Sequence, residues 1–146
     1  MSARWPSIAT LLPHAGAMVL VDAIVECDAQ RIVCTSASHR DPHHPLRVNG
    51  RLPALCGIEI AAQAMALHGA LSRDPPRALR HGRLAAVRDV AVHHPLLDAF
   101  EAPLTVECVL EGVSGNVRGY GFRMTADGTA LLAGRATVWT GDGDPG

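Results

Sequence analysis

The chain has 146 residues, of which 48% are hydrophobic and 18% charged, and its formal net charge is −1. This composition indicates one globular domain over residues 1–146 and excludes a disordered chain. Near-neutral charge and an aromatic content of 3% argue against a general nucleic-acid binder, which needs basic and stacking surfaces.

The four cysteines form no C-x-x-C pair and lie in apolar runs, so we interpret them as reduced, buried thiols. The N-terminus is interrupted by Pro6 and Pro13 and does not resemble a signal peptide. No apolar run approaches the ~20 residues that span a bilayer. A cytoplasmic protein without a membrane span is therefore expected.

The N-terminal third predicts a short helix, a hairpin and a long loop. Residues 5–12 can form about two helical turns, which Pro13 ends. Two runs rich in β-branched residues, 18–27 and 31–38, flank Asp-Ala-Gln and predict a hairpin. The segment 39–53, rich in His, Pro and Asn-Gly, predicts a loop.

The remainder predicts one apolar helix followed by antiparallel strands. Residues 55–71 form the helix, and strand-like runs follow at 84–96, 103–115, 117–128 and 129–140. A helix that is apolar on every side must be covered on every side. A curved antiparallel sheet wrapped around the helix, with a second chain covering the rest, meets this need. The expected fold class is therefore α+β, of the layout called the hotdog fold.

The apolar helix contains one carboxylate, Glu59. A buried lone carboxylate costs several kcal/mol unless it is hydrogen-bonded, neutralised or facing a cavity. Glu59 could be a structural residue stabilised by the helix N-terminus, an effect of ~0.3–1 kcal/mol. Alternatively it lines a pocket and transfers protons, with Gln63, one turn further on, holding the carboxyl group in place.

Three stretches resemble the 3-hydroxyacyl-ACP dehydratases. In "LPALCGIEIAAQA" a proline precedes the glutamate by six residues, and E-x-x-x-Q follows. The opening "LLPHAGAMVLVDAIVE" and the segment "VAVHHPLLDAFEAPLTVECVLE" resemble the same family in matching order. The phrase "GRLPALCGIEIAAQAMALHGAL", together with "LPHAGAM", looks still closer to the ApeP-like dehydratases associated with aryl polyene biosynthesis.

The resemblance implies an enzyme that dimerises and builds each active site from two chains. A His of one chain removes the α-proton of a 3-hydroxyacyl thioester, and the helix carboxyl group of the other, here Glu59, protonates the departing hydroxyl. The acyl chain is expected in an apolar tunnel beside the helix. The substrate-binding positions are expected at Ala54, Leu55, Gly57 and Gln63, the first three through backbone amides that polarise the thioester carbonyl. The substrate is expected to arrive on the phosphopantetheine of an acyl carrier protein, with no further cofactor.

The position of the family's histidine is occupied here by Pro45. His44 lies one residue earlier and is the expected base, ahead of His43. Alternatively, this chain lacks the base and a partner supplies it. We expect His14 to serve a turn or a cap, and His68 to be a core or interface residue.

A basic stretch follows the helix. Arg77, Arg80 and Arg83 are expected to bind the acidic carrier or the phosphate of its arm, because guanidinium groups suit phosphate. The alternative is a solvated turn. No metal site is expected, because no H-E-x-x-H or Cys/His spacing occurs.

Three functional hypotheses follow. The first is a dehydratase that converts carrier-bound 3-hydroxyacyl thioesters into trans-2-enoyl thioesters. The second is a non-catalytic or half-site subunit of a heterodimeric dehydratase. The third is a hotdog acyl thioesterase, in which Glu59 would activate water.

Overall fold

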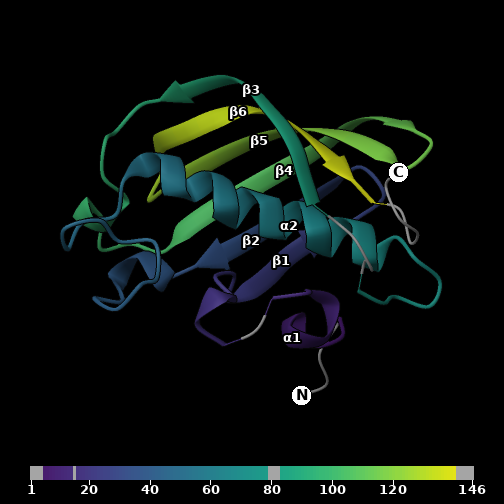
Figure 1. Ribbon diagram of the computed structural model, residues 1–146, viewed down its shortest axis with the longest axis horizontal. Coiled ribbons are helices and arrows are strands. Elements are labelled where there is room, and N and C mark those ends of the chain that lie inside the picture. The colour runs from purple at the N-terminus through teal and green to yellow at the C-terminus, as the bar shows by residue number, and fades with distance from the viewer. Residues whose placement is uncertain (1–4, 15, 79–82, 141–146) are drawn as a thin grey trace.

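Six antiparallel strands form one curved sheet, and the long helix α2 lies across one of its faces (Figure 1). The computed structural model describes residues 5–14, 16–78 and 83–140. The strand order is β1-β2-β4-β5-β6-β3. The helices are α1 (Ile8–Leu11) and α2 (Gly57–Leu71). The strands are β1 (Ala23–Cys27), β2 (Arg31–Ser36), β3 (Arg83–Val92), β4 (Leu104–Ser114), β5 (Val117–Ala126) and β6 (Thr129–Trp139). The 3₁₀ turns are η1 (Gly16–Met18), η2 (Ser38–Arg40), η3 (Ala54–Cys56) and η4 (Leu97–Ala99).

The predicted elements occur in the predicted order, and the α+β hotdog layout is confirmed. The first strand is shorter than predicted, because it begins at Ala23 and not at residue 18. The reason lies at Leu20, whose amide and carbonyl bind the side chains of Gln63 and Ser36. Those groups are therefore not available to a neighbouring strand.

Helix α2 is the centre of the core. Most of its residues are buried, and the partly exposed ones in its first half are Ile58, Glu59 and Ala62. Ala54–Leu71 is long and apolar enough to cross a membrane, but 67% of it is buried inside the protein. A core helix has this property, and the sheet covers it with inward side chains such as Cys108 and Met124.

The start of α2 is fixed by the loop that precedes β4. The Ala54 amide donates to the Pro95 carbonyl over 2.8 Å, and the Leu97 amide donates to the Leu52 carbonyl over 2.9 Å. Asp98 accepts a hydrogen bond from the Leu52 amide at 2.9 Å. These bonds hold the first turn of the helix at one end of the sheet.

Gly57 allows this first turn to approach the sheet closely. A Cβ atom at this position would lie 3.0 Å from Leu132 Cδ2 and 3.0 Å from Met124 Sδ. We therefore expect Gly57→Ala to lower the free energy of unfolding by about 1–3 kcal/mol, measured by urea denaturation. Gly112→Ala is the matched control, because its Cβ would meet no atom within 4 Å. Equal stability of the two variants would contradict the packing argument.

Strand β3 forms one edge of the sheet, and most of its side chains are exposed. In the described part of the chain no strand pairs with its outer side. Its pairing with β6 shifts register between Arg88 and Ala91, where Asp89 has a φ of 54°. Val90 and Val92, in the last part of this strand, are exposed. The edge is thus open to a further strand.

Candidate active site

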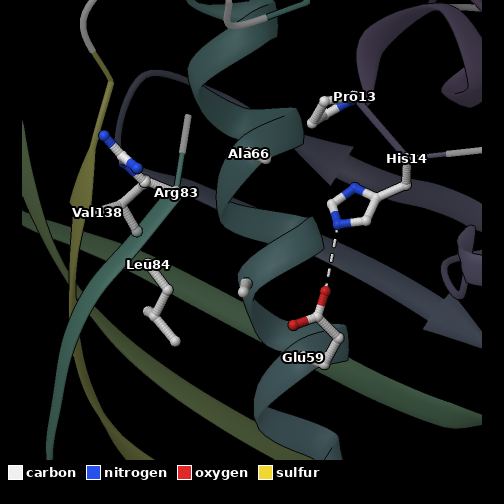
Figure 2. A pocket seen from close by; sticks show the side chains of 8 residues that line it. Pro13, His14, Glu59, Ala66, Arg83, Leu84 and Val138 are labelled. Carbon is white, nitrogen blue, oxygen red and sulfur yellow. Dashed lines mark ion pairs between the residues drawn. The ribbon is translucent and has the colours of Figure 1, made fainter. Parts of the chain in front are cut away.

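The N-terminal segment brings His14 to the carboxyl group of Glu59. His14 Nε2 lies 3.2 Å from Glu59 Oε1, and the two side chains are 27% and 36% exposed. Figure 2 shows the imidazole and the carboxyl group facing each other along α2. Leu11 and Leu12 are buried in the core just before His14, which fixes the path of the segment over the helix.

A pocket of about 200 Å³ lies beside this pair, between α2 and the strands β3 and β6 (Figure 2). Its walls are mostly apolar and are formed by Pro13, Ala62, Ala66, Leu84 and Val138. For comparison, an engineered cavity of about 150 Å³ binds benzene. The pocket therefore has room for a short acyl segment next to the carboxyl group.

An imidazole and a carboxyl group in contact can act as a general base and a general acid on one substrate. When the carboxyl group carries the proton and the imidazole is neutral, the pair contains both an acceptor and a donor. The apolar wall beside it suits a substrate whose reacting carbon atoms carry an acyl chain. The site is therefore built for proton transfer next to a hydrophobic group.

Gln63 does not hold the carboxyl group, as the sequence had suggested. Its side chain is 0% exposed, its Oε1 accepts the Leu20 amide at 2.8 Å, and its Nε2 donates to the Met18 carbonyl at 2.5 Å. Both polar ends are thus used to bind the backbone of the N-terminal segment. A direct substrate contact by Gln63 is therefore corrected to a structural contact inside the core.

His44, the expected base, lies in the loop between β2 and α2 and is only 4% exposed. Its Nδ1 accepts the Leu46 amide at 3.0 Å, and its Nε2 has no hydrogen-bond partner. Burial lowers the pKa of this imidazole. Within the described residues no ion pair joins His44 to Glu59, and its catalytic role stays a prediction. His43, next to it, is exposed.

The backbone amides expected to bind the thioester carbonyl are mostly used within the chain. Ala54 donates to the Pro95 carbonyl, and the Gly57 amide donates to the carbonyls of Ala54 and Leu55. An oxyanion hole at Ala54 or Gly57 would therefore have to replace an existing bond. At Leu55 the side chain is exposed, and it lies on the same side of the helical surface as Glu59 and Ala62.

The structure describes two of the three arginines of the predicted carrier site, Arg77 and Arg83. Arg77 is exposed, and its amide donates to the Ala70 carbonyl in the last turn of α2. Arg83 begins β3, lines the pocket beside Glu59 and lies 5.8 Å over the Trp139 ring. Arg80 lies outside the described residues. Carrier binding by these residues stays a prediction.

His68 lies at the opposite end of α2 from Glu59 and is fully buried. Its Nδ1 is 2.7 Å from the Tyr120 hydroxyl, and its Nε2 is 2.8 Å from the Asp28 carbonyl oxygen. The structure thus places it in the core, one of the two environments expected from the sequence. Over residues 5–14, 16–78 and 83–140, no three His, Cys, Asp or Glu side chains are grouped as a metal site requires.

His14 contacts Glu59, whereas a turn or a cap was expected at this position. The signal was present, since "LPH" stands directly before the first strand-like run. Local patterns do not say that this segment folds back across α2. The segment is anchored beside the helix by the burial of Leu11 and Leu12 and by the bonds of Gln63 to Leu20 and Met18.

Comparison with known proteins identifies the family and agrees with the fold. Residues 6–145 match the protein family described as ApeP-like, the ApeP dehydratase. Among solved structures, the dehydratase heterocomplex ApeI:P from Xenorhabdus doucetiae has a TM-score of 0.84 at 22% identity, over 94% of this chain and 93% of that chain.

More distant structures share the fold alone. Cj0977 from Campylobacter jejuni has a TM-score of 0.64 at 14% identity, over 95% of this chain and 98% of that chain. The thioesterase HI1161 from Haemophilus influenzae has a TM-score of 0.58 at 14% identity, over 80% of this chain and 75% of that chain. No curated protein matches by sequence. The family match spans nearly the whole chain and includes both His14 and Glu59, so this protein belongs to the ApeP-like dehydratase family.

Proposed function

We propose that this hydro-lyase removes water from a 3-hydroxyacyl thioester carried on an acyl carrier protein and gives the trans-2-enoyl thioester. The observation that carries the proposal is the contact of 3.2 Å between His14 and Glu59 at the wall of an apolar pocket. Acid and base groups at such a distance can both reach the two adjacent carbon atoms of one substrate.

In the proposed reaction the His14 imidazole accepts the proton from the α-carbon of the thioester. The electron pair of that C–H bond forms the double bond, and the C–O bond at the β-carbon breaks. Glu59 donates its proton to the leaving hydroxyl, which departs as water. The imidazolium proton then returns to the Glu59 carboxylate across their contact, which restores both groups. The elimination of water involves no net oxidation or reduction, so it requires no redox cofactor.

A second hotdog subunit is part of the proposal. Leu55 in η3 and Ile58 and Ala62 in α2 are accessible apolar residues around Glu59, and β3 has an open edge. Apolar residues grouped on a surface in this way can mark a site where another protein binds. A related dehydratase is a heterocomplex, which supports a different hotdog chain as the partner.

The carrier protein is proposed to approach from the side of Arg77 and Arg83. Both arginines are exposed, and Arg83 also lines the pocket. A guanidinium group there could bind the phosphate of the phosphopantetheine arm while the acyl group enters beside Glu59.

The test is a dehydration assay read by mass spectrometry. Purified chain is offered a 3-hydroxyacyl group on a carrier protein, alone and with a second hotdog dehydratase subunit. Loss of one water from the carrier-bound acyl group supports the proposal, and activity restricted to the mixture assigns the heterodimer. Release of a free thiol without dehydration would instead support the thioesterase hypothesis and contradict ours.

A further inference from the structure

We propose that Gln63 is a positioning residue that fixes His14 against Glu59. Its side chain is 0% exposed and binds two backbone groups of one short segment, the Met18 carbonyl and the Leu20 amide. The catalytic consequence rests on the proposed function, whereas the positional claim can be measured without any activity.

The position of Gln63 on the helix gives it this role. Gln63 follows Glu59 by four residues, so both side chains leave α2 about one turn apart on the same side. The same rigid helix therefore carries the Glu59 carboxyl group and the Gln63 side-chain amide, which binds the segment that contains His14. His14 lies four residues before Met18, and in the described residues around it the secondary structure is limited to the four-residue α1 before it and the three-residue η1 after it.

The His14 segment is held from both sides. Before it, Leu11 and Leu12 are buried in the core. After it, Gln63 binds at Met18 and Leu20. The Leu20 carbonyl also accepts the Ser36 hydroxyl at 2.6 Å. When Gln63 is replaced, that Ser36 bond remains, so the change in backbone position is concentrated at Met18, the end nearer to His14.

The physical cost of losing Gln63 is specific to this segment. A buried amide or carbonyl without a partner is strongly unfavourable, and the backbone shifts until it finds water or another partner. A displacement of about 1 Å in a catalytic group can cost ~100-fold in rate. Gln63 thus acts on the reaction through His14 and does not touch the substrate itself.

The test compares Gln63→Met with Tyr120→Phe. Methionine fills a similar volume but makes neither bond. Tyr120→Phe removes another buried side-chain hydrogen bond on α2, the one to His68 at the opposite end of the helix. We expect Gln63→Met to lower kcat at least ~10-fold with KM within about threefold, and Tyr120→Phe to lower the melting temperature with kcat within about twofold.

Two measurements separate positioning from general stability. Site-resolved carbethoxylation with diethyl pyrocarbonate, read by mass spectrometry, should show faster modification of His14 in Gln63→Met than in the wild type and in Tyr120→Phe. In a His14→Asn background, Gln63→Met should cause no further loss of kcat, because the group that it positions is already absent. Should Gln63→Met not fold, Gln63→Glu is measured in the same way, since it keeps an acceptor for Leu20 but lacks the donor for Met18.

Unchanged His14 reactivity in the Gln63 variants would overturn the inference, and so would losses of kcat from His14→Asn and Gln63→Met that simply multiply. A wild-type protein inactive with every carrier substrate, alone and with a partner subunit, would refute the proposed function instead. In that case the carbethoxylation rates still decide whether Gln63 positions His14.

Discussion

Glu59→Gln is expected to lower kcat for dehydration by ~10²–10⁴-fold, the usual contribution of a positioned general acid. The amide has nearly the same shape as the carboxyl group but cannot deliver a proton to the leaving hydroxyl. The side chain is 36% exposed and its charged group contacts His14, so the fold should survive the change. Steady-state kinetics and thermal melting of the same preparation check both points.

Glu101→Gln is the matched control, because this glutamate is exposed and lies outside the pocket. It should retain the activity of the wild type. Full activity of Glu59→Gln would remove the acid from the mechanism, whatever the partner contributes.

The base is identified by comparing two histidine variants in the same assay. His14→Asn should lose activity to a degree similar to Glu59→Gln, because the imidazole faces the carboxyl group. His44→Asn should lose far less, since its imidazole is buried and its Nδ1 is occupied by the Leu46 amide. The reverse order would assign the base to the loop, where the family resemblance placed it at His44, one residue before the family position.

Stability is expected to fall as the pH decreases below about 6.5. Burial lowers the pKa of His39, His44 and His68 in the folded protein. The unfolded chain therefore binds these protons first, at its ordinary pKa of about 6.5. The stabilisation is present above that pH and is lost as the pH falls, because protons then favour the unfolded state.

The expected slope follows from proton counting. Each proton bound by the unfolded chain alone contributes about 1.4 kcal/mol per pH unit, so the three imidazoles together can reach about 4 kcal/mol per pH unit. Denaturant unfolding at a series of pH values measures this slope. Asp28 and Asp98 also have lowered pKa values, but carboxyl groups of this kind matter only below about pH 4.

His68→Asn and Tyr120→Phe isolate one of these protons. Both remove the same hydrogen bond, but only the first removes a titrating imidazole. The slope should decrease by about one proton in His68→Asn and stay close to that of the wild type in Tyr120→Phe. Equal slopes in all three proteins would show that His68 is not a source of the acid sensitivity.

The sequence predicted most of the fold because its elements have strong local patterns. Val106 and Cys108 alternate with Thr105 and Glu107 along β4, and the structure buries the first pair and leaves the second pair partly exposed. The apolar helix at 55–71 could be stable only if other parts of the protein covered it, and this requirement led to the prediction of a curved sheet. The 3₁₀ turn at its start was not predicted, because it depends on the bonds of Ala54 and Leu97 to another loop.

The site was only partly predictable for the same physical reason. Glu59 stood out because a carboxylate is costly in an apolar helix. His14 did not stand out, because its contact with Glu59 joins positions 45 residues apart and no local sequence pattern indicates it. Gln63 was recognised as important but given the wrong contact, since spacing along a helix says which face a side chain occupies and not which neighbour it meets.

The open edge at β3 also affects how this protein behaves in solution. Backbone groups along an unpaired strand attract strands from other molecules, and long flat edges promote fibrous aggregates. Here β3 shifts register at two places, between Leu84 and Ala86 and between Arg88 and Ala91, and Asp89 at the second place has a positive φ. An interrupted edge of this kind can accept one additional strand of limited length, while repeated strand addition is disfavoured.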